Sequence, residues 1–266
     1  MRTLLVIAAT SAACGSVQFD PPDGGSVIDT GSDGIVVDGV LGPDAWSSHC
    51  APAPPITNIE DNHSAFGSTC IHGSWNLSAV SGTTVPVTAG QPGNNAVVVP
   101  TVGTNPLNPA STFVVHVSGS GQASGPGTIP YATLGAPLNT IPAMASGTVD
   151  ASAYTGIQFS GKLVAGTLGI RLGVANLYTD PVGGLCGGGG ATGCYDDPSA
   201  PLQVGAGWVT YRVPFDQLTQ LGFGNPSPVG ASFPRDHITR LVWIVMIPAT
   251  GPVDPWDLMI DDVTFY

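Results

Sequence analysis

The chain has 266 residues, of which 18 are acidic and six are basic, and its formal net charge is −12. Nucleic acids and anionic membrane surfaces both require a positive face, so this charge argues against either as a partner. Only 9% of the residues are charged, whereas 37 are glycine and 25 are proline. That composition is typical of short strands joined by tight turns, and it disfavours long helices.

The first residues have the features of a targeting segment. Arg2 supplies a positive charge, Leu4 to Ala9 are apolar, and small residues then lead to Cys14. The stretch SAAC resembles a bacterial lipobox, in which the cysteine is lipidated and becomes the mature N-terminus. Ser11 stands where leucine is usual, so ordinary secretion remains the alternative. We therefore expect a signal peptide over residues 1–13 and an outer-membrane or cell-surface lipoprotein, otherwise a secreted protein, that touches a membrane only through its lipid.

Residues 14–55 are predicted to form a flexible acidic tether. They contain six aspartates and no basic residue, and Gly, Pro and Ser fill most of the remaining positions. Such a segment cannot bury enough apolar surface to offset the entropy lost on ordering. As a flexible coil of about 40 residues it would reach roughly 35 Å, enough to hold a domain clear of a bilayer.

Four cysteines remain after Cys14, and an even number in an exported chain predicts disulfides. Cys186 and Cys194 enclose the glycine-rich loop CGGGGATGC, which has no adjacent histidine to complete a zinc site. A local disulfide between them is therefore expected. Cys50 and Cys70 are then left to pair with each other, an inference from proximity among three possible connectivities.

Residues 56–266 show the pattern of one all-β domain. Short apolar runs predict strands at 112–118, 154–160, 168–177, 208–213, 238–247 and 258–266, with two more between 75 and 100. The three-residue spacing of Phe215, Leu218 and Leu221 indicates one or two turns of helix within 214–223. Strands without crossover helices predict a β-sandwich or a jelly roll.

Alternation along these strands separates core residues from an outward face. The outward set contains long polar side chains beside several small residues, and it comprises His116, Gln158, Arg171, Thr210 and Arg212. We interpret this set as one shallow groove with hydrogen-bond donors, which suits a sugar. An ordinary solvated sheet face is the alternative interpretation, because exposed polar residues are common.

Five motifs in the C-terminal half carry a family resemblance: VDASAYTGIQF (149–159), YTDPVGGLC (178–186), CYDD (194–197), GWVTYRVPFDQLTQLGFG (207–224) and DLMIDDVTFY (257–266). Upstream, ITNIEDN (56–62), GSW (73–75) and HVSGSGQ (116–122) follow the expected order. Together they resemble galactose-binding-like jelly rolls, similar to carbohydrate-binding modules of family 11 and to the intermediate-associated domain. The sequence departs from the pattern at Asn76 and Ser160, where aromatic residues are usual, and both changes reduce the stacking surface for a sugar.

The resemblance implies that the first and last strands are neighbours and that a structural calcium ion lies near them. It places the metal ligands at Glu60 or Asp61 and at Asp261 or Asp262. Adjacent carboxylates on a regular strand point to opposite faces. Either Asp261 or Asp262 would therefore face the core, and an unpaired carboxylate there would cost roughly several kcal/mol. A calcium ion would remove that cost, because it binds carboxylate and carbonyl oxygens, and so would a network of hydrogen bonds.

The segment from Tyr178 to Asp197 is predicted to form a polar rim around the disulfide loop. Tyr178, Asp180, Tyr195 and Asp196 are candidate ligand contacts there, together with the groove residues His116, Gln158, Arg171 and Arg212. Tyrosine offers a flat apolar ring with a hydroxyl, and charged side chains form the stronger hydrogen bonds to sugar hydroxyls. Turn formation by the TDP sequence and solvation of the acids is the alternative.

The sequence argues against an enzyme. A glycosidase needs two facing carboxylates about 5–9.5 Å apart, and neighbouring Asp261 and Asp262 are expected to point away from each other. We find no nucleophile elbow, zinc-protease motif or phosphate-binding loop in the sequence. We therefore expect a noncatalytic cell-surface or secreted protein that binds a polysaccharide or other glycan, with a structural or adhesion lipoprotein that makes protein–protein contacts as the alternative.

Overall fold

The structure is a computed structural model, and it describes residues 56, 65–67, 71–79, 96–97, 100–122, 131–138, 140–141, 145–164, 169–181, 186, 193–203, 205–246 and 252–266. The expected signal peptide and tether (residues 1–55) lie outside the described residues. So do five of the predicted site residues, namely Cys14, Cys50, Glu60, Asp61 and Cys70.

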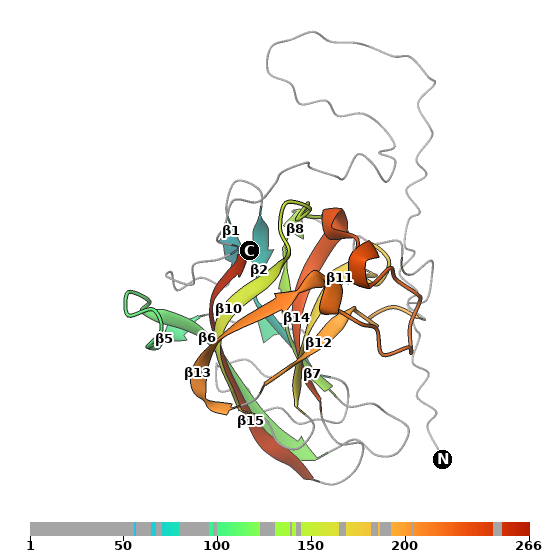
Figure 1. The fold of residues 1–266 in the computed structure, drawn as a ribbon. Coiled ribbons are helices and arrows are strands. Elements are labelled where there is room, and N and C mark those ends of the chain that lie inside the picture. The colour runs from blue at the N-terminus through green and yellow to red at the C-terminus, as the bar shows by residue number, and fades with distance from the viewer. Residues whose placement is uncertain are drawn as a thin grey trace, which may run out of the picture. The chain divides into compact units, whose positions relative to one another are not determined.

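Two antiparallel sheets form a β-sandwich (Figure 1). The five-stranded sheet has the order β13 (Gly205–Pro214), β10 (Gly156–Val164), β15 (Pro252–Phe265), β6 (Phe113–Gln122) and β5 (Thr101–Val102). The six-stranded sheet has the order β12 (Ser199–Leu202), β11 (Ile170–Asn176), β14 (Ile238–Met246), β7 (Tyr131–Pro137), β3 (Asn76–Ala79) and β4 (Ala96–Val97). Two small hairpins, β1 (Ala65–Gly67) with β2 (His72–Ser74) and β8 (Thr140–Ile141) with β9 (Ala145–Ser146), complete the described strands.

The strand order is that of a jelly roll. From β6 onward the long strands alternate between the sheets along the chain, except where β11 and β12 pair within one sheet. As a result β15, the last strand, lies between β10 and β6, and β14 lies between β11 and β7. This double-sheet wrapping is the jelly-roll arrangement, and it confirms the fold class predicted from the sequence.

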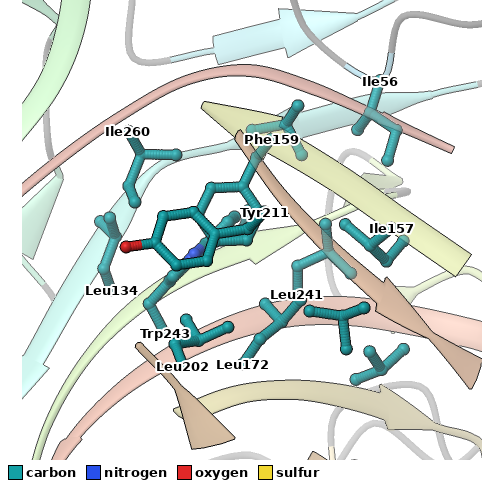
Figure 2. Close-up of a cluster of buried hydrophobic side chains, with 14 of the residues drawn as sticks. Ile56, Leu134, Ile157, Phe159, Leu172, Leu202, Tyr211, Leu241, Trp243 and Ile260 are labelled. Carbon is teal, nitrogen blue, oxygen red and sulfur yellow. The ribbon is translucent and has the colours of Figure 1, made fainter. Parts of the chain in front are cut away.

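The core lies between the sheets and contains stacked aromatic rings (Figure 2). Trp243 on β14 is fully buried and contacts Phe159 on β10 edge to face, with ring centroids 5.4 Å apart. Phe159 in turn stacks on Tyr211 of β13 at 4.9 Å, and Trp75 packs against Trp243 at 5.6 Å. Aromatic pairs in these geometries add stability beyond the area they bury, so these rings hold the two sheets together.

Ile56, the first described residue, lies beside the last strand, β15. The amide of Ile56 donates a hydrogen bond to the carbonyl of Val263 on β15, at 3.0 Å. Among the described residues, no helix has the length and apolar character needed to cross a membrane.

One local expectation was confirmed only in part, and one long strand was missed. The helix expected within 214–223 is a single 3-10 turn, Phe215–Gln217, and the chain is extended at Leu218. Strand β7 at 131–137, which pairs with both β14 and β3, was not among the strands predicted from the sequence. The remaining predicted strands are present, with β3 and β4 as the two expected between residues 75 and 100.

Candidate ligand-binding surface and acidic cluster

The predicted single groove is divided between the two outer faces of the sandwich. His116, Gln158 and Arg212 lie on β6, β10 and β13 of the five-stranded sheet. Arg171 lies on β11 of the six-stranded sheet, which is on the other side of the core. All four alternate with buried core residues and therefore point outward. The expectation that Arg171 and Arg212 share one face is wrong.

On the five-stranded sheet the outward polar residues pair with one another. Arg212 donates from Nε to the Gln158 amide oxygen at 2.7 Å, and its guanidinium lies 5.3 Å from the ring centroid of Tyr266. His116 Nε2 lies 3.1 Å from a carboxylate oxygen of Asp257. These pairs have the character of a solvated sheet face, the alternative weighed from the sequence.

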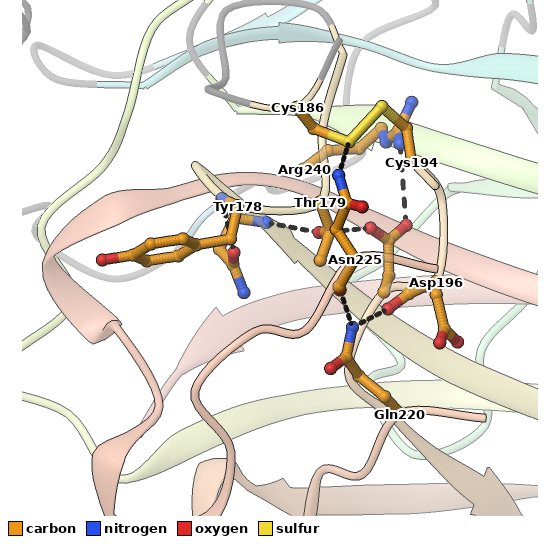
Figure 3. Close-up of a disulfide and its surroundings, with 10 residues drawn as sticks. Tyr178, Thr179, Cys186, Cys194, Asp196, Gln220, Asn225 and Arg240 are labelled. Carbon is orange, nitrogen blue, oxygen red and sulfur yellow. Dashed lines mark hydrogen bonds and ion pairs between the residues drawn. A yellow bond between two sulfur atoms is a disulfide. The ribbon is translucent and has the colours of Figure 1, made fainter. Parts of the chain in front are cut away.

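Two tyrosines on neighbouring segments next to the six-stranded sheet are exposed. Tyr178 and Tyr195 have 40% and 44% of their surface exposed. The amide of Tyr195 donates to the carbonyl of Thr179 at 2.9 Å, which ties the two segments together. Tyr178 is oriented by its own amide, which donates to the side-chain oxygen of Asn176 at 2.9 Å, and its ring points away from the disulfide (Figure 3).

Arg240 lies beside Tyr195, and we call Tyr178, Tyr195 and Arg240 the tyrosine surface. Arg240 is on β14, and its guanidinium lies 5.9 Å from the ring centroid of Tyr195. Arg240 was not among the site residues predicted from the sequence. Its alternation with Leu241 on a predicted strand could have placed it on an outward face, but nothing local connects it to residues 178 and 195.

Two of the predicted contacts, Asp180 and Asp196, are buried rather than exposed on the rim, each with 1% of its surface accessible. The Asp196 carboxylate accepts backbone N–H hydrogen bonds from the four consecutive residues 221–224. Asp180 accepts a hydrogen bond from the hydroxyl of Thr239 at 2.8 Å. Neither carboxylate is free for direct contact with a ligand, so both support the surface from beneath.

Asp197 lies in the same buried network. It accepts a 2.6 Å hydrogen bond from the Thr179 hydroxyl, and its other oxygen lies 3.6 Å from Nη2 of Arg240. Burial raises the pKa of Asp197 to about 6, against the opposing effect of Arg240. Because this pKa lies above the unfolded value, the contribution of Asp197 to stability is greatest in acid and is lost as the pH rises through about 6.

The predicted disulfide between Cys186 and Cys194 is present, with Cα atoms 5.6 Å apart. Asn225 Nδ2 lies 3.6 Å from Cys186 Sγ (Figure 3). The backbone N–H of Asn225 donates a hydrogen bond to the carbonyl of Gly193. Gln220 donates to the carbonyls of both Asp196 and Asn225, each at 2.8 Å. The disulfide segment and the loop after β13 are thus joined into one framework behind Tyr195.

Arg171 lies on the same outer face as Arg240, further along the sheet. It pairs with Ile244 in the β11–β14 register, whereas Arg240 pairs with Ala175, four positions away on β11. The Arg171 side chain donates to the hydroxyl and the carbonyl of Ser199 on β12, both at 3.0 Å. Its role as a ligand contact stays a prediction.

Asp261 and Asp262 form a separate acidic cluster on β15, and the expectation that they point apart is wrong. Asn105 donates from Nδ2 to both carboxylates, at 2.9 Å and 3.0 Å. The cause is a bulge: Asp261 pairs with Ser160 but Thr264 pairs with Gln158, so β15 carries one extra residue.

Backbone strain accompanies this bulge. Asp262 has φ of +50°, in the left-handed region that non-glycine residues seldom adopt. Its carboxylate also accepts a hydrogen bond from Asn108 at 2.8 Å, and its amide donates to Asp261 at 2.8 Å. Burial raises the pKa of Asp261, and hydrogen bonds from Ser111 and Asn105 limit the increase. The hydrogen-bonded network considered from the sequence as an alternative to calcium is therefore present.

The acidic cluster offers part of a calcium-binding set. Its two carboxylates are the hard oxygen donors that calcium prefers, but a calcium ion needs about six to eight oxygen ligands. The side-chain oxygens of Asn105 and Asn108 accept hydrogen bonds from the backbone of Leu107 and Ala110. The described part of the chain contains no group of three or more His, Cys, Asp or Glu residues able to hold a metal. Further ligands would have to come from elsewhere, as the predicted Glu60 or Asp61 would provide.

Comparison with known proteins gave structural matches only. No protein-family model matches the sequence, and the search of curated proteins found no match. The structure is similar to the family 11 carbohydrate-binding module of the cellulase Lic26A-Cel5E of Clostridium thermocellum, with 16% identity, a TM-score of 0.43, and coverage of 72% of this chain and 86% of that one.

Two further matches have similar or lower scores. The Clostridium thermocellum module in complex with a β-1,3-1,4-mixed-linked tetrasaccharide matches with 16% identity, a TM-score of 0.44, and coverage of 75% of this chain and 89% of that one. The enzymatically active domain of tailspike protein 4 of bacteriophage CBA120 matches with 14% identity and a TM-score of 0.36, and covers 84% of this chain and 23% of that one.

Proposed function

We propose that this protein is a noncatalytic carbohydrate-binding protein and that its ligand lies on the tyrosine surface. The observation that carries the proposal is the placement of exposed Tyr195 beside a partly exposed arginine, Arg240, with exposed Tyr178 on the segment that is hydrogen-bonded to Tyr195. Tyrosine rings pack against the C–H groups of a sugar, while their hydroxyls and the guanidinium bond to its hydroxyls.

The absence of a catalytic role is part of the proposal. Asp261 and Asp262 converge, which removes the geometric argument that they point apart. However, Asp261 is fully buried beneath the segment that carries Asn105, so a glycosidic bond could not reach it. The other buried carboxylates, Asp180, Asp196 and Asp197, are held by threonine hydroxyls or backbone amides. These are supporting roles.

Tyr195→Ala is expected to weaken polysaccharide binding about two- to tenfold, because stacking of one aromatic ring contributes on the order of 0.5–1.5 kcal/mol. Tyr178→Ala should have a similar effect. Affinity gel electrophoresis against a panel of neutral and acidic polysaccharides, followed by calorimetry, measures both. Val209→Ala, which truncates an exposed residue on the other sheet, is the matched control. Retention of no polysaccharide by the wild-type protein would contradict the proposal.

A structural or adhesion role is the second candidate, and one observation favours it. Leu221 and Phe223 are 50% and 53% exposed on the loop held by Asp196. Exposed apolar residues gathered on one loop are common at protein interfaces. Recovery of a protein partner by photo-cross-linking from position 223, with no glycan retained, would favour this role over carbohydrate binding.

We also propose that the protein is exported, as a surface lipoprotein anchored through Cys14 or otherwise as a secreted protein. The disulfide between Cys186 and Cys194 supports an oxidising compartment, since such bonds are rare in the cytosol. Metabolic labelling with a fatty-acid analogue in wild type and Cys14→Ser distinguishes the two forms, because only a lipidated cysteine would carry the label.

Calcium is proposed as a structural ion of the acidic cluster. We expect added calcium to raise the melting temperature by several degrees and a chelator to reverse the change, because an ion present at 100 times its dissociation constant stabilises the fold by about 2.7 kcal/mol. Asp262→Asn should abolish the shift. Differential scanning calorimetry with and without EDTA measures it, and identical melting curves for the wild-type protein would rule the ion out.

A further inference from the structure

Arg240 lies at the tyrosine surface, and its two acidic neighbours do not use all of its hydrogen-bond donors. Its Nε lies 3.9 Å from Asp180 and its Nη2 lies 3.6 Å from Asp197, both beyond hydrogen-bond distance. The Nε–H is buried and has no acceptor among the described residues. The side chain keeps 20% of its surface exposed. An arginine has five donors, so this one retains capacity for another acceptor.

The two carboxylates are kept at this distance by other bonds. The hydroxyl of Thr179 donates to Asp197 at 2.6 Å, and the hydroxyl of Thr239 donates to Asp180 at 2.8 Å. These short bonds orient the carboxylates away from a bidentate contact with the guanidinium. Arg240 therefore lies between two fixed acids and can move toward a ligand without leaving either one unpaired.

Tyr195 covers the guanidinium and is itself held under strain. Its φ is +71°, a left-handed conformation that is costly for a tyrosine. The hydrogen bond from its backbone amide to the Thr179 carbonyl holds it in this conformation. The ring centroid then lies 5.9 Å from the Arg240 guanidinium, and 44% of the surface of Tyr195 is exposed. A ligand that packs on this ring would thus lie next to the exposed edge of the guanidinium.

We propose that Arg240 is a ligand-binding residue of the tyrosine surface and that protonation of buried Asp197 controls its availability. The inference rests on the proposed carbohydrate-binding function. With Asp197 ionised, two carboxylates share one arginine and draw it inward. With Asp197 neutral, that attraction is reduced and the donors of Arg240 are freer to reach sugar hydroxyls.

The charges around Asp197 set the pH at which this change occurs. Burial raises its pKa to about 6, Arg240 and Thr179 act to lower it, and Asp180 and Asp196 raise it further. We therefore expect affinity to increase about 2.5- to fivefold as the pH falls from 7 to 5, which corresponds to a ligand-induced pKa increase of about half to one unit.

The coupling can be measured without any ligand. In a ¹⁵N NMR titration, the Nε–H signal of Arg240 should shift with a midpoint near the pKa of about 6 in the wild-type protein. Asp197→Asn should remove the transition while leaving the rest of the spectrum folded. An Arg240 chemical shift that stays constant between about pH 4.5 and 7.5 would overturn the coupling. So would a transition that persists in Asp197→Asn.

The role in binding is measured with the β-1,3-1,4-mixed-linked tetrasaccharide and the polysaccharide panel at pH 5 and pH 7. Arg240→Gln should lose at least about tenfold in affinity at pH 5, and Arg240→Lys should recover only part of it, because lysine keeps the charge but not the planar fork of donors. Lys162→Gln, on the other sheet, is the control for charge removal. Wild-type affinity in Arg240→Gln would overturn the inference while leaving carbohydrate binding intact. No binding of any probe by wild type would instead overturn the proposed function, and the ligand role of Arg240 with it.

Discussion

Asp196→Ala is expected to lower the free energy of unfolding by about 3–5 kcal/mol, because four backbone N–H groups lose a charged acceptor, and such bonds contribute about 1.5–3 kcal/mol each before water at this exposed loop compensates for part of the loss. The carboxylate is 1% exposed. It accepts N–H hydrogen bonds at 2.8–3.1 Å from Leu221, Gly222, Phe223 and Gly224. Alanine would leave these four donors without their acceptor in a segment that packs closely on the disulfide region. Urea denaturation monitored by tryptophan fluorescence measures the change.

Asp196→Asn separates the charge from the shape of the side chain. The amide keeps one accepting oxygen but replaces the other with an NH₂ group, which would face backbone donors rather than acceptors. Oδ2 alone accepts from Gly222, Phe223 and Gly224, so we expect the asparagine variant to lose at least half of the stability lost by alanine. Asp216→Ala, at an exposed aspartate, should change stability by less than about 0.5 kcal/mol.

The same variants decide between two roles for Asp196. A ligand contact, as predicted from the sequence, would lose affinity on substitution while the unfolding curve stayed in place. A residue that holds the loop would lose stability first, and would lose binding only as the loop moves. An unchanged free energy of unfolding in both Asp196 variants would therefore favour a ligand contact and contradict the buried arrangement of Asp196.

Strand alternation predicted which side chains point outward but not which sheet they belong to. Alternation is a property of a few consecutive residues, whereas sheet membership depends on pairing partners far away in the chain. Arg171 and Arg212 were both correctly placed outside the core, yet the jelly-roll wrapping puts their strands in different sheets. The same limitation concealed Arg240, whose neighbours Asp180 and Asp197 are about 60 and 43 residues away in sequence.

The convergence of Asp261 and Asp262 could not be predicted from alternation either. A regular strand would have separated them, and only the extra residue opposite β10 turns them toward one amide. The positive φ at Asp262 gave no local sequence signal, since such positions usually carry glycine. Two adjacent acids in an alternating apolar stretch did indicate an unusual site, and that part of the prediction was useful.

Strand β7 and the expected helix show how packing overrides local preference. The sequence YATLGAP is rich in small residues with weak strand preference, yet β7 lies between two strands and buries Ala132, Leu134 and Ala136. In the 214–223 segment, Phe215 and Leu218 are buried as a helical face would require, but Leu221 is 50% exposed. Contacts formed across the sandwich decided both outcomes.

Trp243→Ala is expected to cost about 3–5 kcal/mol of unfolding free energy, the range for removing a large buried aromatic side chain. Trp243 is fully buried on β14 and contacts Phe159, on the opposite sheet, edge to face at 5.4 Å. It also packs at 5.6 Å on Trp75, the residue immediately before β3. Alanine would open a cavity at the point where the sheets meet, and neighbouring rings that stack on one another cannot readily collapse into it.

Trp243→Phe distinguishes lost volume from a lost hydrogen bond. The indole Nε1 is buried and has no acceptor among the described residues, so phenylalanine gives up no hydrogen bond and relieves the cost of burying that donor. We therefore expect only about 1–2 kcal/mol of destabilisation from Trp243→Phe, with native far-ultraviolet circular dichroism retained. A phenylalanine variant as unstable as the alanine variant would mean that Nε1 does donate to a group in the folded protein. A loss below about 1 kcal/mol in the alanine variant would mean that Trp243 does not join the two sheets.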